Sequence, residues 1–136
     1  MTWVLFNKDR FNIKAVAISQ SHHNLGTGAN YCPNTPLTNN IVNNLISNNI
    51  AVFFPAGNLK DTSRISWPAC ITNSLAVSAS AYGDGPALYT NYDPLATDFF
   101  ARGDINSILP NGTKANVAGT SVSNQVARSE EHTSEL

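Results

Sequence analysis

The chain has 136 residues, of which 42% are hydrophobic and only 12% are charged, a composition that suits one globular domain and excludes an intrinsically disordered chain. Its formal net charge of -1 gives no reason to expect a nucleic-acid partner, and no apolar run is long enough to span a bilayer. No signal peptide opens the sequence, so the N-terminus does not indicate a compartment.

The first half of the chain reads as helix, strand, helix and strand. Residues 3–10 are typical of the end of an amphipathic helix, and residues 13–19 form a short apolar run that favours a buried parallel strand. A second helix is expected between Thr35, a natural N-cap followed by proline, and Asn48, with aliphatic residues on one face. Residues 50–54 predict the next strand, and this order predicts a parallel α/β sheet covered on both faces.

The second half is richer in short elements. Residues 59–66 read as a polar loop, and Trp67-Pro68 is a candidate cis peptide because proline lowers the cis penalty to about 0.5–1 kcal/mol. Residues 75–80 predict another strand. Three short strands follow at 98–100, 105–108 and 114–117, and they lead into a helix that begins near Ser121.

The last nine residues differ in composition from the rest. Residues 1–127 contain no glutamate, whereas residues 128–136 contain three. This nonapeptide resembles the in-frame translation of a common sequencing-adapter oligonucleotide, so we expect a non-native tail over 128–136 and exclude it from the domain. The alternative is a genuine, solvated helical tail. Without these residues the chain has seven basic and six acidic residues, a formal charge of +1.

The stretch Gly119-Thr120-Ser121 could carry chemistry. A hydroxyl at a helix N-terminus lies beside unpaired backbone N–H groups and the positive end of the helix dipole, so an oxyanion formed there would be stabilised. The same three residues often only cap a helix. In open parallel sheets, ligands bind beyond the carboxyl ends of the strands, which here are residues 19–21 and 55–58.

Six segments occur in an order and spacing that resemble the subtilisin-like serine proteases, the subtilase or peptidase S8 family. They are Asn12–Ser19, Ile50–Asn58, Ile65–Cys70, Leu75–Ser80, Tyr89–Tyr92 and Ala118–Ser121. The resemblance implies a parallel-sheet, three-layer subtilisin-like fold that is incomplete at both ends. Residues 1–127 would then be a partial catalytic domain, the nucleophile half, and the parent protein a secreted, extracellular enzyme.

The same resemblance implies roles for particular residues. Ser121 would be the nucleophile and Asn58 the side-chain donor of an oxyanion hole, whereas the simpler interpretation is that Asn58 ends a strand and Ser121 caps a helix. The polypeptide substrate would pair with Ser19, Gln20 and Ser21, and Pro55, Ala56 and Gly57 would wall the pocket for the residue before the cleaved bond. Relatives usually have Ser-Leu-Gly and Ala-Ala-Gly at these two places. The resemblance therefore does not imply which substrates this chain would accept.

A serine nucleophile requires a histidine base and an orienting carboxylate. The family supplies them from an Asp-Thr/Ser-Gly turn and a His-Gly-Thr motif upstream of the serine, and this sequence has neither. His22 and His23 fall at the wrong point in the order and are expected in a loop. We therefore expect that the N-terminal half of the catalytic domain is missing and that this fragment is inactive. Two alternatives are a catalytically dead binding module and an unrelated doubly wound domain that binds a small ligand.

Cys32 and Cys70 form an even pair without histidine at ligand spacing, which argues against zinc. Cysteines at both positions in some secreted relatives make a disulfide plausible, the alternative being two reduced, buried thiols. No cofactor is required, and no side-chain metal site is expected. Structural calcium held by backbone carbonyls would leave no signature in the sequence. Asn111-Gly112-Thr113 is an N-glycosylation sequon, which is relevant in a eukaryotic secretory pathway.

Overall fold

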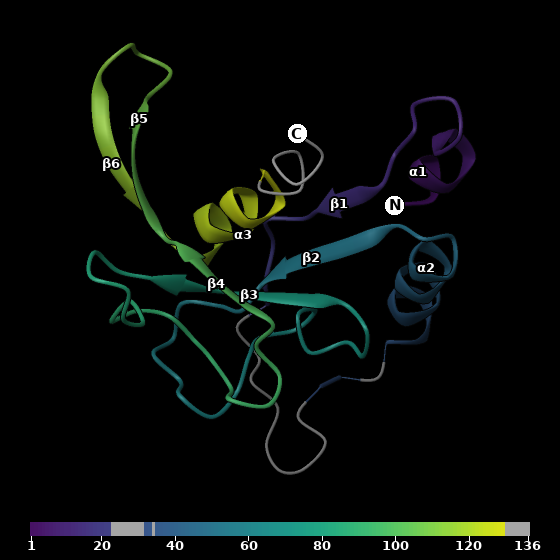
Figure 1. Ribbon diagram of the computed structural model, residues 1–136, viewed down its shortest axis with the longest axis horizontal. Helices are drawn as coiled ribbons and strands as arrows, with labels where there is room; N and C mark the ends of the chain where they lie inside the picture. Colours follow the sequence, from purple (N-terminus) through teal and green to yellow (C-terminus); the bar gives the residue numbers. More distant parts are fainter. Residues whose placement is uncertain (23–31, 34, 130–136) are drawn as a thin grey trace.

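A parallel four-stranded sheet in the order β1-β2-β3-β4 organises the chain (Figure 1). The computed structural model describes residues 1–22, 32–33 and 35–129. The strands are β1 (Ala15–Ala17), β2 (Ala51–Pro55), β3 (Leu75–Ser80) and β4 (Phe99–Arg102). The prediction of a parallel α/β sheet is confirmed. The predicted strand at 13–19 is shorter than expected and half-buried rather than buried, because β1 forms an edge of this sheet and pairs only with β2.

Helices α2 and α3 cover opposite faces of the sheet and complete the three layers. From α2 (Pro36–Ser47), Val42 and Leu45 are buried in the core that includes Phe54. The other face is crossed by α3 (Thr120–Ser129), which contacts all four strands. Side chains alternate between the two faces of a strand, so neighbouring residues of β2 and β3 fill both layers.

The remaining helical predictions differ from the structure in detail. Helix α1 (Thr2–Asn7) lies beside α2, ends earlier than expected and has no fully buried residue (Figure 1). Thr35 does precede α2, but its hydroxyl contacts the Asn39 side chain at 3.4 Å and not a backbone N–H group. The predicted end of this helix at Asn48 is confirmed, and Asn49 follows with a φ of 57°.

Between β4 and α3 the chain forms an antiparallel hairpin that projects from the body (Figure 1). Its strands are β5 (Asp104–Ile108) and β6 (Lys114–Ala118), close to the ranges predicted. Before β3, the Trp67-Pro68 peptide is cis, as predicted. Because β6 runs directly into α3, the hairpin delivers the chain to Thr120 and Ser121.

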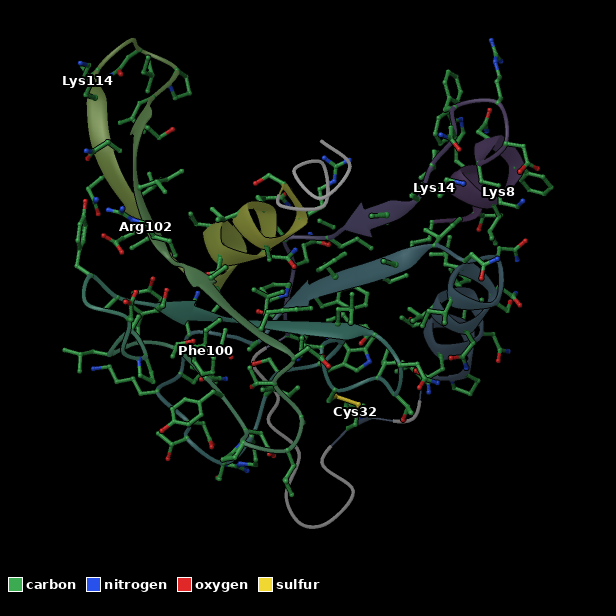
Figure 2. The ribbon with its side chains drawn as sticks, viewed as in Figure 1. Lys8, Lys14, Cys32, Phe100, Arg102 and Lys114 are labelled. Atoms are coloured by element: carbon green, nitrogen blue, oxygen red, sulfur yellow. A yellow bond between two sulfur atoms is a disulfide. The ribbon has the colours of Figure 1, made fainter. Side chains whose placement is uncertain are left out.

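One disulfide joins Cys32 to Cys70, with a Cα–Cα distance of 5.6 Å (Figure 2). It links the segment before α2 to the segment after the cis peptide. At the C-terminus, α3 continues to Ser129, so the first residues of the expected tail extend this helix. Residues 130–136 lie outside the described part of the chain, as does His23. No helix in the described ranges is long and apolar enough to cross a membrane.

Candidate active site

Ser121 lies in the first turn of α3, directly against the end of β1. Its hydroxyl donates to the Ser19 carbonyl at 3.4 Å, and the Ser19 hydroxyl donates to the Ser121 carbonyl at 3.2 Å. The side-chain amide of Gln125, one turn further along α3, donates to the Ser19 hydroxyl. The structure thus brings together the predicted nucleophile and the first residue of the predicted substrate-binding segment, although they are 102 positions apart.

Asn58 is fixed against the same turn by its carboxamide oxygen. This Oδ1 accepts from the Thr120 backbone N–H at 2.9 Å and from the Thr120 hydroxyl at 3.0 Å. With the oxygen occupied, the amide nitrogen is the group left to meet a ligand. Asn58 and Ser121, predicted to meet in one crevice, are therefore neighbours through Thr120.

Gly119 provides the space that these groups share. A Cβ placed on Gly119 would lie 3.4 Å from Nδ2 of Asn58 and 3.9 Å from the backbone nitrogen of Ser121. The amide nitrogen of Asn58 and the backbone nitrogen of Ser121 consequently border one small space beside Gly119. Oxyanion holes require donors converging on the place where negative charge develops. Asn58 and Ser121 thus place two potential donors near one point, the kind of arrangement that an oxyanion hole would require.

A buried amide holds the loop that carries Asn58. Asn91 is fully buried, and its Oδ1 accepts from the backbone N–H groups of Leu59 at 2.7 Å and Asp61 at 3.2 Å. Its Nδ2 donates to the Ser66 hydroxyl at 3.2 Å. Both the oxygen and the nitrogen of the Asn91 side chain are hydrogen-bonded, so the loop just after Asn58 has a defined shape. This shape also restricts the direction in which the Asn58 amide nitrogen points.

Gly57 is required at its position, and its replacement gives a testable result. Its φ is +107°, and an added Cβ would lie 2.2 Å from Ser66 Oγ and 2.6 Å from Asn91 Nδ2. We expect Gly57→Ala to lower the free energy of unfolding by about 2–4 kcal/mol, the sum of backbone strain and overpacking. Urea unfolding of the complete protein measures this loss.

Gly112 is the matched control, because its φ is also positive, at +82°, but an added Cβ there meets nothing within 4 Å. Gly112→Ala should therefore cost only the backbone strain, about 1–2 kcal/mol. Equal losses for the two variants would contradict the crowding inferred around Gly57.

Tyr89 fixes the turn that precedes the nucleophile. Its hydroxyl donates at 2.7 Å to the Gly103 carbonyl, which also accepts the Gly119 backbone N–H at 2.8 Å. Burial raises the pKa of Tyr89 and outweighs a hydrogen bond from the Gly119 backbone that lowers it. The phenol therefore stays protonated and able to donate at neutral pH.

Asp61 lies in the loop beyond Asn58 and is engaged by its own neighbours. Burial raises the pKa of Asp61, but hydrogen bonds from Ser63 and Arg64 together lower it by more. The pKa of Asp61 is therefore below the ordinary value for an aspartate. The Arg64 guanidinium lies 2.7 Å from the carboxylate. Asp61 is thus an ionised residue that stabilises the loop.

Apart from Ser19, which contacts Ser121, the predicted substrate-binding residues fall into two groups. Gln20 and Ser21 line a cavity of about 380 Å³, together with His22, whose backbone N–H donates to the Trp67 carbonyl at 2.7 Å. Pro55, Ala56 and Gly57 are buried, and Ala56 packs within the hydrophobic core. No group of three or more His, Cys, Asp or Glu side chains that could hold a metal occurs within residues 1–22, 32–33 and 35–129.

The sequence matches no protein-family model and no curated protein. Solved structures do match. The prenylagaramide maturation protease PagA superposes with a TM-score of 0.71 at 18% identity, covering 93% of this chain and 44% of PagA. The self-cleaved protease domain of PatA gives a TM-score of 0.70 at 20% identity, covering 91% of this chain and 46% of that one. A mutant of the PatA protease domain gives a TM-score of 0.69 at 20% identity, covering 90% of this chain and 44% of that one.

The fold is subtilisin-like. The chain spans less than half the length of these neighbours. At this level of identity the likeness establishes the architecture and leaves the activity to be argued from the residues themselves.

Within this subtilisin-like fold, several residues shape the site through contacts that the sequence does not indicate. Thr120 orients Asn58, Asn91 holds the following loop, Tyr89 fixes the turn before Ser121, and Gln125 binds Ser19. Three of them lie in or beside segments that carry the family resemblance. Gln125 lies outside the segments that carry the resemblance, so no signal marked it.

Proposed function

We propose that this chain is the nucleophile-bearing part of a serine endopeptidase that cleaves polypeptides through an acyl-enzyme on Ser121. In this reaction the serine oxygen attacks the peptide carbonyl carbon and the amine leaves after taking up a proton. Water then hydrolyses the ester and regenerates the hydroxyl. The fold is that of proteases, which supports this reaction class.

One observation carries the proposal, namely the fixed orientation of the Asn58 carboxamide. Thr120 occupies its oxygen with two hydrogen bonds, at 2.9 and 3.0 Å, and this leaves the nitrogen beside the space that the Ser121 N–H also borders. A residue that merely ended a strand would not need both of these bonds. Serine, amide nitrogen and backbone N–H together are the acyl-transfer part of a catalytic site.

The proton-transfer part would come from the rest of the protein. The hydroxyl of Ser121 donates to a backbone carbonyl, a group that cannot act as a base. Within the described sheet, β1 pairs on one side only, so its other edge can accept a further strand. A missing half that adds strands there would bring its histidine and carboxylate to the carboxyl end of β1, beside Ser19 and Ser121.

Labelling with a fluorophosphonate probe tests the proposal, because such probes react with activated serines. Residues 1–136 alone should not be labelled, whereas the complete protein should be labelled on Ser121 and the Ser121→Ala variant should not. Labelling of the isolated chain would show that it needs no further base. Failure of the intact complete protein to react would refute the proposed activity.

A catalytically dead binding module is the second candidate, the alternative that the sequence leaves open. The gene sequence before Met1 distinguishes the two. Asp-Thr-Gly and His-Gly-Thr motifs there would support the protease. A full-length upstream half that lacks both would support the binding module.

The compartment, partners and cofactors of the protein are part of the same proposal. The Cys32–Cys70 disulfide supports a secreted or extracellular protein, since structural disulfides persist in oxidising compartments. The partners would be a polypeptide substrate and the missing half of the domain, with neither nucleic acid nor membrane involved. No cofactor takes part in the reaction, and any structural calcium would be bound through backbone carbonyls.

A further inference from the structure

The tip of the β5–β6 hairpin presents an asparagine to solvent. Residues 108–114 are all exposed, and the turn is closed by hydrogen bonds from Leu109 N–H to the Thr113 carbonyl and from Gly112 N–H to the Leu109 carbonyl, both 2.8 Å. Lys114 marks the outer end of β6 beside this turn (Figure 2). Nothing in this protruding turn contributes to the site around Ser121.

The side chain of Asn111 is held in one orientation by Thr113. Its Oδ1 accepts from the Thr113 hydroxyl at 2.7 Å and from the Thr113 backbone N–H at 3.1 Å. Within the described part of the chain, the amide nitrogen of Asn111 makes no hydrogen bond. Gly112 between them has open space around it, since an added Cβ would meet no atom within 4 Å.

This arrangement suits a reaction at the amide nitrogen. A carboxamide nitrogen is a poor nucleophile because its lone pair is delocalised into the carbonyl. Hydrogen bonds donated to Oδ1 stabilise the negative charge that develops on the oxygen when the nitrogen loses a proton, so Thr113 is placed to activate Asn111. The open surroundings leave room for a bulky group on the nitrogen.

We propose that Asn111 is a modification site that accepts an N-linked oligosaccharide. Among all asparagines of the chain, only Asn111 has serine or threonine two positions later with a residue other than proline between. The donor would be a lipid-pyrophosphate-linked oligosaccharide. Nδ2 of Asn111 bonds to the anomeric carbon, the bond from that carbon to the pyrophosphate oxygen breaks, the lipid pyrophosphate leaves with the electron pair, and Nδ2 gives one proton to a base of the transferase.

The disulfide supports this inference, because oligosaccharide transfer and disulfide formation occur in the same oxidising compartment. The inference does not depend on protease activity, since the hairpin tip lies in a different part of the chain from Asn58 and Ser121. Either proposal can therefore fail without the other.

Translation of the full chain behind a cleavable signal peptide, in the presence of rough microsomes, tests the site. We expect one gel shift that an endoglycosidase reverses. Asn111→Gln and Thr113→Ala should both lose the shift, and Thr113→Ser should keep it because the hydroxyl is retained. Alkylation of the same samples shows whether Cys32 and Cys70 have paired, so a loss of glycan is distinguished from a failure to fold.

Three outcomes would overturn the proposal. The wild-type chain could show no shift, or it could carry only deamidated Asn111 without sugar. A shift that persists in Asn111→Gln would assign the oligosaccharide to another residue.

Discussion

Under the proposed function, replacing Asn58 with alanine should lower the kcat of the complete protein by about 10²–10³, the loss known for removal of one oxyanion-hole donor from subtilisin itself. The substitution removes the amide nitrogen that Thr120 leaves unoccupied, while the Ser121 backbone N–H remains. Because the charge exists only in the transition state, KM should change little. Steady-state kinetics on a peptide substrate measures both constants.

Two variants separate the donor from the structural role of this residue. Asn58→Asp keeps an oxygen that can accept from Thr120, but it replaces the donor with a second acceptor, so its kcat should fall at least as far. Thr120→Ser keeps the hydroxyl that binds both Asn58 and the Gly57 N–H and should retain most activity. A rise in KM with unchanged kcat in Asn58→Ala would assign Asn58 to substrate binding and not to the oxyanion.

The fold was predictable from the sequence where local pattern and tertiary environment agree. The strand at 75–80 was predicted with the bounds that β3 has, because an apolar run buried on both sides carries its own signal. The run at 13–19 carried the same signal, yet only Ala15–Ala17 forms strand. In the described sheet this segment pairs with one strand only, β2, so fewer of its residues are held in strand conformation. The number of pairing partners cannot be predicted from local composition.

The candidate site, like the fold, could be predicted from the sequence only in part. The proximity of Asn58 and Ser121 followed from the ordered motifs, because each motif marks the end or start of an element that meets the others at one edge of the sheet. The contacts that aim Asn58 could not be predicted, since Thr120 and Asn91 act through hydrogen bonds that exist only after folding. Pro55 and Ala56 are expected to wall a pocket, a role that burial alone does not test, and the structure buries both side chains in the interior.

Removing the disulfide should destabilise the protein by about 4 kcal/mol, because the bridge closes a loop of 38 positions and restricts the unfolded chain. The measurement is the free energy of unfolding of a Cys32→Ala, Cys70→Ala double variant, compared with the wild type with and without reductant. Reduced wild type should match the variant, and the variant should not respond to reductant. A loss under about 1 kcal/mol would contradict the entropic effect expected for this loop.

The same variant tests how the site is held. The closed loop, residues 32–70, contains Asn58, whereas the groups that orient Asn58 and its loop, Thr120 and Asn91, lie outside it. Below the unfolding transition, kcat of the double variant should therefore equal that of the wild type. A lower kcat in the folded variant would instead show that the bridge itself positions Asn58. The disulfide is expected to set the temperature at which the protein unfolds, while the hydrogen bonds made by Thr120 in α3 and by Asn91 after β3 determine the geometry of the site.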